Sequence, residues 1–448
     1  MQQARAPVWF LAAVWLLIVG AFALGLHLGA RTNLPEPQSV ELRAVLQKIV
    51  ETHVDPQDPH KLLDLAIKGM ASFDHYGQFV PAGEVDDYNE ATTGNYEGIG
   101  LVQLPVDGRL FVHFPLAGGP ADRAGLRPGD EIVAIDGVEI ASMTAAERAR
   151  LAETRIRGPA GTKVRLTIAR AAAAPQTFEI ERAAVHKPCV KWAHRIDPEQ
   201  GLGYVHVSDF HPGVDAELLA ALTALAAEPG GLRGLVLDLR FDGGGYLDSC
   251  IAMANLFLAH GTIVTVRKRG NAIEQQHDAD PGKCRFPELP LAILVNQDSA
   301  SASEVLTGAL QDHDRAVVVG ELTYGKGMVN TEFKYTHPDF VLKVTTGHYY
   351  TPKGRNLEGH FGRQPGKQPL GGIMPDREVR LSDAQTRAVY LALLGQEPPA
   401  ACRQAVAELS ERHGLRAPAI VPPADDPQLA AALAALRQRL GGGGNGGR

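Results

Sequence analysis

The stretch "VNQDSASASEVLTGALQDHDRAVVVGELTYGKGMVN", residues 295–330, places Ser299, Ser301 and Ser303 within five positions. It follows an apolar run typical of a buried strand and leads into helical periodicity. A strand, a tight turn and a helix start can display a nucleophile, and the helix N–H groups favour a developing oxyanion. A structural interpretation competes. Ser301 and Glu304 match an S-x-x-E capping box, with Ser301 as N-cap and Glu304 at N3.

A serine nucleophile needs a base close to it. No Ser-His-Asp set is present nearby, because His313 lies past the far end of the helix expected at 302–312. Lys326 is the other candidate, and the glycines on both sides of it permit an unusual turn and close backbone approach. A lysine acts as a base only if burial or positive potential lowers its pKa. A solvated loop lysine is therefore the alternative.

Composition bounds the class of protein. The chain has 448 residues, enough for two or three domains. Apolar residues make up 45% and charged residues 21%, as in an ordinary folded protein with a core. The net charge is −7, and no Lys/Arg-rich stripe is present, so we expect no nucleic-acid partner.

The N-terminal 31 residues differ from the rest. Residues 7–30, "PVWFLAAVWLLIVGAFALGLHLGA", contain no Lys, Arg, Asp or Glu, and they exceed the roughly 20 residues that a spanning helix needs. Arg5 precedes them, which favours a cytoplasmic N-terminus. The pattern favours an uncleaved transmembrane signal-anchor over residues 1–31. A cleaved signal peptide is the alternative, although its apolar region is usually only about 7–15 residues. Either way, the bulk of the chain is expected to be exported.

The cysteines are four in number: Cys189, Cys250, Cys284 and Cys402. Export permits disulfides, and four cysteines allow three full pairings. Sequence proximity favours a Cys250–Cys284 bridge. The spacing contains no CxxC and no neighbouring His pair, so it does not indicate a metal site.

Element patterns divide the remaining chain. Residues 32–95 begin with helical periodicity, and residues 96–184 alternate short β-like runs with turns. Residues 185–385 alternate buried-type strands with helices, which predicts a largely parallel sheet covered on both faces. Residues 386–448 read as Ala/Leu-rich helices followed by a Gly-rich tail.

The segment 96–184 resembles a PDZ domain in two motifs, "YEGIGL" and "GGPADRAGLRPGDEIVAIDGVEI". The first matches the carboxylate-binding loop of that fold, which here is Gly98, Ile99, Gly100 and Leu101. Its glycines would let successive N–H groups face a terminal carboxylate, and an extended peptide would add to the sheet edge. A plain β-turn with structural glycines is the alternative.

The serine stretch together with "LDLRFDGGGYL", "GHYYTPKGRNL" and "GIMPD" closely resembles the carboxyl-terminal processing peptidases, or tail-specific proteases. The resemblance covers residues 40–385. It implies a multidomain α/β (α+β) fold with a ClpP/crotonase-like peptidase core and an inserted PDZ β-barrel-like domain, to which the apolar N-terminal segment adds the expected transmembrane helix. It implies no metal and no organic cofactor.

Carried over by motif, the resemblance makes Ser301 the nucleophile and Lys326 the general base, 326 − 301 = 25 residues later. It places oxyanion donors at the N–H groups of Ala302 and Gly244. Asp312 matches an acidic position expected to support structure.

Two departures from the family pattern stand out. The family often has Gln four residues after the lysine, where it orients that lysine, and this chain has Asn330 as a shorter possible orienter. The family usually has Gly where this chain has Asp298, whose carboxylate would oppose an oxyanion unless it points away or caps the helix.

The implied function is an exported, membrane-anchored serine endopeptidase that binds apolar C-terminal tails of proteins through the PDZ domain. It would reside in a bacterial inner membrane, held by its N-terminal helix, with the catalytic part facing the periplasm, and it could form a homo-oligomer. The alternative is a catalytically weak or inactive binding or scaffold protein, since the wider superfamily includes retinoid-binding repeats without protease activity.

Overall fold

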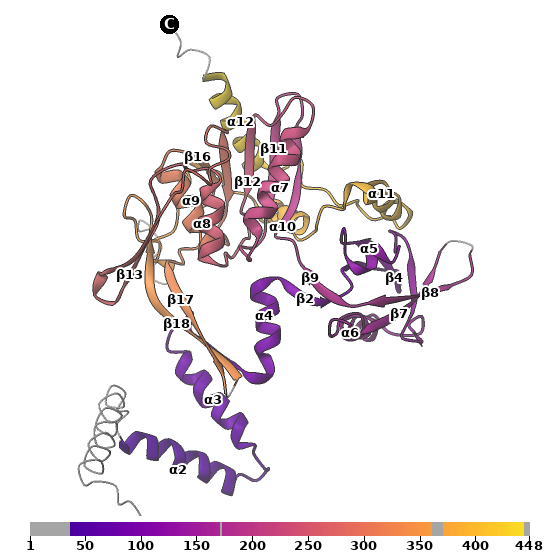
Figure 1. Ribbon diagram of the computed structural model, residues 1–448, viewed down its shortest axis with the longest axis vertical. Helices are drawn as coiled ribbons and strands as arrows, with labels where there is room; N and C mark the ends of the chain where they lie inside the picture. The colour runs from indigo at the N-terminus through magenta and orange to yellow at the C-terminus, as the bar shows by residue number, and fades with distance from the viewer. Residues whose placement is uncertain (1–35, 171–172, 338, 361–370, 443–448) are drawn as a thin grey trace, which may run out of the picture.

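The computed structural model describes residues 36–170, 173–337, 339–360 and 371–442. The segment predicted as a transmembrane anchor, residues 1–31, lies outside these ranges. Within them, no helix combines the length and the apolar character needed to cross a membrane. Figure 1 shows an N-terminal helical arm, a PDZ-like domain to one side and a central α/β core.

The core is built on a six-stranded sheet in the order β10-β11-β12-β15-β16-β19. Within this sheet, β11, β12, β15, β16 and β19 run parallel to one another, and β10 runs antiparallel to β11. β11, β12 and β15 are buried along their full length, as expected for strands covered on both faces. The strands are β10 (Val190–Asp197), β11 (Leu202–Val207), β12 (Gly234–Asp238), β15 (Leu291–Val295), β16 (Ala316–Gly320) and β19 (Arg377–Glu378).

Helices cover both faces of this sheet. Helices α7, α8 and α9 share one hydrophobic cluster with it, and α10 and α12 share the other. α9 matches the helix expected at 302–312. The helices are α7 (Val214–Ala227), α8 (Leu247–Asn255), α9 (Ala302–Asp312), α10 (Asp383–Leu393), α11 (Arg403–Arg412) and α12 (Pro427–Gly442).

The C-terminal helix α12 is an integral part of this core. Leu429, Leu433 and Leu436 are buried in the second cluster. Just before α12, Asp426 pairs with the buried Arg240 at 2.9 Å, and Arg240 also pairs with Asp238 at 2.6 Å. The region expected as an extension therefore completes one face of the sheet, because that face would otherwise be exposed.

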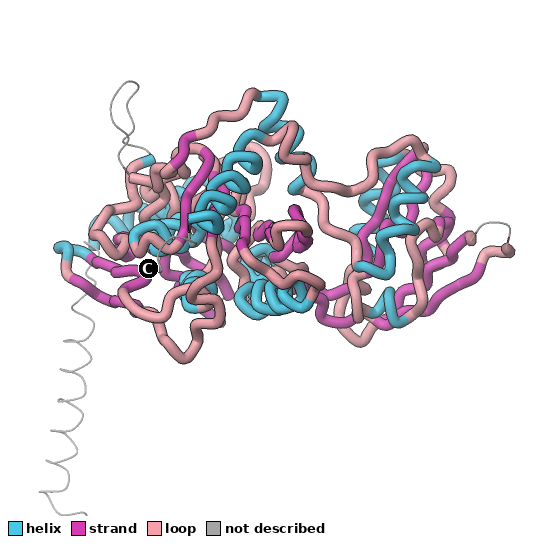
Figure 2. Tube along the Cα trace, turned by 90° about the horizontal axis from the view of Figure 1, so that it is seen from above, coloured by secondary structure: helices cyan, strands magenta, loops and turns pink. Residues whose placement is uncertain are grey.

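The PDZ-like domain has its own sheet, in the order β3-β4-β5-β7-β8, and its own hydrophobic cluster. A two-stranded ribbon of β2 and β9 leads into and out of it, so its two connections to the core lie side by side. Figure 2, seen from above, shows this domain as a separate lobe beside the core. Its elements and ribbon are β2 (Asn95–Gly98), β3 (Leu101–Val106), β4 (Arg109–Pro115), α5 (Pro120–Arg123), β5 (Glu131–Ile135), β6 (Val138–Glu139), α6 (Ala145–Ile156), β7 (Lys163–Ala169), β8 (Gln176–Glu181) and β9 (Ala183–His186).

A second sheet joins the N-terminal arm to the core. β18 pairs with β1, β13 and β17, so residues near position 80 lie against residues near 340. In Figure 1, α2 and α3 project beyond the β17–β18 ribbon. The elements are α2 (Glu36–Thr52), α3 (Pro59–Ala71), β1 (Gln78–Pro81), α4 (Val85–Thr93), β13 (Thr262–Lys268), β14 (Ile273–Asp278), β17 (Met328–Thr336) and β18 (Asp339–Tyr350).

The predicted Cys250–Cys284 disulfide is wrong, since all four cysteines have free thiols. Cys250 is fully buried within the first core cluster. Cys284 lies in a loop, where its Sγ hydrogen-bonds to the Leu256 carbonyl at 3.7 Å. Proximity in sequence failed here because α8 directs Cys250 into the core, and a disulfide requires matched side-chain geometry.

Candidate active site

Ser301 lies in the turn between β15 and α9, where the sequence predicted an exposed nucleophile. Its backbone has φ 57° and ψ −116°, an uncommon conformation for a residue with a Cβ. The Val305 N–H donates to the Ser301 carbonyl at 2.9 Å and begins the helix. Strained backbone of this kind clusters at active sites, where the surrounding structure holds it in place.

The three serine hydroxyls have different surroundings. Ser299 Oγ donates to the Leu239 carbonyl at 2.7 Å, and Ser303 Oγ donates to the Asp242 carbonyl at 3.0 Å. The Ser301 side chain makes no cap hydrogen bond. Ser301 and Glu304 face each other in the capping-box arrangement that the sequence predicted, and the Ser301 N–H donates to Glu304 Oε2 at 2.9 Å. The hydroxyl of Ser301 is therefore available for chemistry.

Glu304 connects the two members of the proposed dyad. Its Oε2 accepts the N–H of Ser301 and also the N–H of Lys326, the latter at 2.8 Å. Its Oε1 accepts the Gly325 N–H at 2.7 Å and the Thr323 hydroxyl at 2.5 Å. The side chain is fully buried, and burial raises its pKa while these hydrogen bonds oppose the rise. The sequence indicated Glu304 as a cap but contained no local signal of its link to Lys326.

Lys326 and Ser301 line one cleft of about 610 Å³. Burial lowers the pKa of Lys326, and the nearby Lys343 lowers it further, while Glu304 and Glu358 raise it. The net shift is downward, which is the direction that a general base requires. Lys326 is thus no freely solvated loop lysine.

The glycines around Lys326 allow close backbone approach, as the sequence indicated. Gly325 has φ +89°, in the left-handed region. A Cβ on Gly327 would lie 2.1 Å from the Glu358 backbone nitrogen. The Gly327 N–H donates to Glu358 Oε2 at 2.9 Å, so residues near 358 close against this loop.

Ala302 and Gly244 both lie at the nucleophile turn. The Ala302 N–H, at the first position of α9, has no hydrogen-bond acceptor in the described part of the chain. A Cβ on Gly244 would lie 2.6 Å from the Ala300 carbonyl oxygen and 2.8 Å from the Ala302 nitrogen. The Gly244 N–H itself donates to Asp242 Oδ1 at 2.8 Å. To donate to an oxyanion, the Gly244 N–H would therefore have to give up its hydrogen bond to Asp242.

Asp242 is a buried carboxyl beneath the same turn, and sequence reasoning did not single it out. Its side chain is fully buried, and its Oδ2 has no hydrogen-bond partner among the described residues. Its carbonyl accepts the Ala300 N–H at 3.0 Å. Burial raises the pKa of Asp242 well above its usual range, against a lowering by the Gly244 hydrogen bond. This shift favours the neutral carboxylic acid over the carboxylate.

The two departures from the family pattern occupy different places. Asn330 lines the catalytic cleft, but its Nδ2 donates to the Tyr76 carbonyl at 3.4 Å and to Thr345 Oγ1 at 3.1 Å. Within the described ranges it makes no hydrogen bond to Lys326. Asp298 is exposed and lines a different cavity, beside Phe241, so it points away from the catalytic cleft.

Asp312 supports structure at the far end of α9. Its Oδ2 accepts the Lys353 N–H at 2.9 Å, and its Oδ1 pairs with Arg355 at 2.5 Å. These contacts tie the helix to the loop after β18, as the sequence predicted for this residue.

The predicted carboxylate loop of the PDZ-like domain is packed against its neighbours. Ile99 is fully buried, and its carbonyl accepts the Ala121 N–H at 2.8 Å. Gly98 ends β2, Gly100 has φ +69°, and Leu101 begins β3. Val102 and Leu116, on either side of this loop, line a cavity of about 550 Å³. This cavity shares Ala91, Asp209 and His211 with the catalytic cleft, so the two hollows adjoin.

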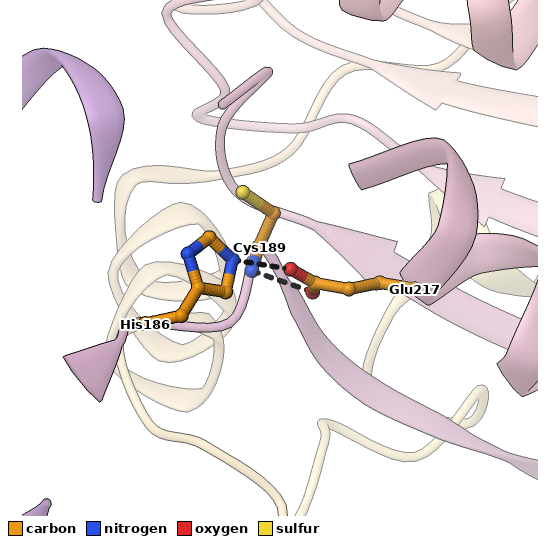
Figure 3. A group of neighbouring side chains, drawn as sticks. All are labelled: His186, Cys189 and Glu217. Carbon is orange, nitrogen blue, oxygen red and sulfur yellow. Dashed lines mark hydrogen bonds and ion pairs between the residues drawn. The ribbon is translucent and has the colours of Figure 1, made fainter. Parts of the chain in front are cut away.

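Three side chains at the junction of β9, β10 and α7 could together hold a metal ion: His186, Cys189 and Glu217. Their contacts already form a structural clip. His186 Nε2 pairs with Glu217 Oε1 at 2.7 Å, and the Cys189 N–H donates to Glu217 Oε2 at 2.8 Å. Figure 3 shows the Cys189 thiol pointing away from that carboxylate. Burial raises the pKa of this thiol to about 12, which disfavours the thiolate that a metal needs.

Comparisons with known proteins place this site in a family. The family model for peptidase family S41 matches residues 201–379, and that for the PDZ domain matches residues 115–170. A carboxy-terminal-processing protease of Bartonella bacilliformis is 33% identical over 393 residues, covering 86% of this chain and 87% of its own. A carboxyl-terminal-processing protease of Synechocystis sp. is 38% identical over 293 residues, covering 64% of each chain.

Among solved structures, the photosystem II D1 C-terminal processing protease matches 75% of this chain and 91% of its own, at 26% identity and a TM-score of 0.41. The chain is a serine hydrolase of mixed α/β fold with a PDZ domain, and it belongs to the carboxy-terminal-processing proteases of peptidase family S41.

Proposed function

We propose that this protein is an exported, membrane-anchored endopeptidase that cleaves with a Ser301–Lys326 dyad and binds the C-terminal tails of its substrates through the PDZ domain. The observation that carries the dyad is the shared carboxylate of Glu304, which accepts the backbone N–H groups of both residues. No local feature requires a helix cap to contact a lysine 22 positions later. The contact is useful if both side chains act on one scissile bond.

The chemistry follows from this placement. Neutral Lys326 Nζ takes the proton from Ser301 Oγ as that oxygen forms a bond to the scissile carbonyl carbon. The negative charge that develops on the carbonyl oxygen meets the Ala302 N–H at the start of α9. The C–N bond then breaks, the ammonium of Lys326 returns its proton to the leaving amine, and an acyl ester remains on Ser301. A water molecule, deprotonated by Lys326, releases the acid.

The decisive test is hydrolysis of an unfolded protein with an apolar C-terminus by the full chain in detergent micelles. Ser301→Ala and Lys326→Ala should each abolish cleavage, and Ser299→Ala should retain it as the matched serine control. Mass spectrometry should find an acyl adduct on Ser301 after rapid acid quenching. Cleavage that survives both substitutions would exclude the dyad. A folded protein that binds tails but never cleaves them would favour the scaffold alternative.

Tail recognition is supported by the adjoining hollows. The cavity beside the PDZ domain is lined by Val102 and Leu116 and also by charged side chains, and it meets the catalytic cleft at Ala91, Asp209 and His211. A peptide held by its C-terminus in the PDZ domain would thus extend toward Ser301. Val102→Glu should weaken the binding of a labelled peptide ending in apolar residues, and peptide amidation should do the same. Equal binding of the amidated peptide would contradict carboxylate recognition.

Membrane anchoring and a periplasmic address are supported by sequence alone, through the uncharged residues 7–30. We propose that this segment stays attached and lies in the bacterial inner membrane. Cell fractionation should recover the full-length chain with inner membranes after an alkaline wash, and external protease should digest it in spheroplasts but not in intact cells. Recovery in the soluble periplasmic fraction would indicate a cleaved signal peptide instead.

Self-association through the N-terminal arm is a further part of the proposal. Large apolar side chains on and around α2 and α3 are exposed, including Val45, Val54, Leu65 and Phe73. A second copy could cover them. Light scattering should give a mass above that of one chain, and Val45→Glu with Leu65→Glu should reduce it. An unchanged monomeric mass in the unsubstituted protein would exclude this interface.

A further inference from the structure

Among the described residues, no side-chain amide hydrogen-bonds to Lys326, although Asn330 stands where such an amide is expected. The two donor positions of Asn330 Nδ2 point to the Tyr76 carbonyl and to Thr345 Oγ1. Both partners are hydrogen-bond acceptors, so the two N–H groups of the amide are used, and within the described ranges its Oδ1 makes no hydrogen bond to Lys326. Another group must hold the flexible lysine side chain toward Ser301.

The face of the Tyr76 ring lies against the lysine instead. Lys326 Nζ is 5.0 Å from the centroid of this ring, within the range of a cation–π contact. Tyr76 belongs to the loop between α3 and β1, about 250 residues away in sequence, and it is half-buried. Its ring therefore reaches Lys326 from the N-terminal arm.

Two hydrogen bonds hold the backbone of Tyr76, and its neighbours Asp74 and β1 are held in turn. Its N–H donates to Asp74 Oδ1 at 3.0 Å, and Asp74 Oδ2 accepts the Thr345 N–H at 3.1 Å. Its carbonyl accepts from Asn330, and the following strand β1 pairs with β18. The ring is thus positioned by the same β17–β18 ribbon that carries Asn330 at its cleft end.

We propose that Tyr76 is the positioning residue of the catalytic lysine in this chain, acting through its ring face, and that Asn330 acts only indirectly by holding the Tyr76 carbonyl. The inference rests on the proposed Ser301–Lys326 dyad. A ring face attracts an ammonium more than a neutral amine. It therefore stabilises Lys326 at the moment when the lysine takes the proton from Ser301, and it restricts where Nζ can lie.

The charged groups around Lys326 set the direction of the pH effect. Burial and Lys343 lower its pKa, and Glu304 and Glu358 raise it. The ring adds to the raising effects, because it favours the charged form. Removing the ring should therefore lower the lysine pKa further and move the rising limb of the pH–rate profile to lower pH. The other titratable groups lining the cleft are Asp209, His211, Tyr246, Asp248, Glu332 and Tyr349.

The test compares Tyr76→Leu, Tyr76→Phe and Asn330→Ala in the full chain. Tyr76→Leu should lower kcat by about 3- to 30-fold with little change in KM, and shift the rising limb downward by up to about one pH unit. Tyr76→Phe, which keeps the ring, should recover most of that loss. Tyr335→Leu, at an exposed tyrosine of the same β17–β18 ribbon, is the matched control and should leave the limb in place.

Labelling of Ser301 by a fluorophosphonate separates this inference from the dyad. If Lys326→Ala labels as fast as the unsubstituted protein at every pH, the dyad itself fails. Suppose that Lys326→Ala is labelled slowly, but Tyr76→Leu is labelled as fast as the unsubstituted protein and over the same pH range. In that case only the role of Tyr76 is overturned. If the rate falls and the rising limb of the pH–rate profile shifts in Asn330→Ala but not in Tyr76→Leu, then Asn330 and not Tyr76 positions Lys326. Melting temperatures of all variants show whether each has folded.

Discussion

The nucleophile turn, residues 296–304, and the base loop, residues 323–328, face the same cleft but are held by different means. In the nucleophile turn, the hydroxyls of Ser299 and Ser303 bind the backbone just past β12, the neighbouring strand. The base loop is held by segments far from it in sequence: Glu304 from α9, Glu358 from the loop after β18, and Ile373. The serine turn is thus held by its own strand and helix together with the neighbouring strand, whereas the lysine is held by contacts from three separate segments.

The difference implies that the base loop is the more fragile half of the site. Its backbone depends on the carboxylates of Glu304 and Glu358 and on backbone hydrogen bonds to several separate segments, all of which must be in place. The nucleophile turn is attached to two adjacent parallel strands and would keep its shape when the base loop moves. Substitutions in each half should therefore separate loss of positioning from loss of fold.

The largest effect is expected where the two halves meet. Glu304→Ala leaves the N–H groups of Ser301, Gly325 and Lys326 unpaired in a buried site, which should cost more than about 3 kcal/mol of unfolding free energy. We expect kcat/KM to fall by at least about 10²-fold as the dyad loses its alignment. Thermal unfolding and peptide hydrolysis measure the two losses. The exposed Glu274→Ala on β14 is the matched control, and equal behaviour of the two variants would contradict the bridging role.

The base loop alone can be displaced by Gly327→Ala. The added Cβ would meet the Glu358 backbone at 2.1 Å, so the loop must shift. A displacement of about 1 Å should lower kcat by about 10²-fold with a smaller effect on the melting temperature. Gly69→Ala on α3, where a Cβ meets nothing within 4 Å, should be neutral. Full activity in Gly327→Ala would mean that the loop can move without harm.

Asp242→Asn tests the nucleophile turn through pH. Burial raises the pKa of Asp242, so between its ordinary value and this raised value the folded state binds more protons than the unfolded state. The stability of the unsubstituted protein should therefore fall as pH rises through that window, by up to about 1.4 kcal/mol per pH unit from this group.

Asparagine is neutral and of similar shape, so Asp242→Asn should lose this dependence while still accepting the Gly244 N–H. The melting temperature of the variant relative to the unsubstituted protein should rise with pH. A constant difference across the pH range would show that Asp242 is ionised in the folded protein.

The smallest effect is expected from Ser303→Ala, within the self-supported turn. It removes one hydrogen bond to the Asp242 carbonyl, and it should cost about 1 kcal/mol of unfolding free energy. Activity should change little, because the Ala300 N–H still holds the same carbonyl. Urea unfolding and kcat/KM measure both, with Ser142→Ala in the PDZ domain as the control. A large loss of activity would assign Ser303 a direct role in the reaction.

Much of the fold could be read from the sequence because its signals are local. The apolar runs of β11, β12 and β15 and the start of α9 at Ala302 follow from hydrophobic pattern and turn chemistry. The PDZ domain was recognisable from two motifs. The Cys250–Cys284 bridge failed, and α12 was taken for an extension, because neither pairing nor packing partners are encoded nearby in sequence.

The sequence by itself determined the nucleophile: a buried strand, a serine turn and a helix start place Ser301 at the edge of the sheet. Only the tertiary structure decided the surroundings of the base. Asn330 turns to Tyr76 and Thr345, Asp298 faces another cavity, and a ring from the N-terminal arm lies against Lys326. The physical reason is the distance along the sequence over which each kind of interaction acts. Strand and helix propensities act over a few residues, whereas the position and pKa of a lysine depend on burial and charge contributed by whatever the fold brings near it.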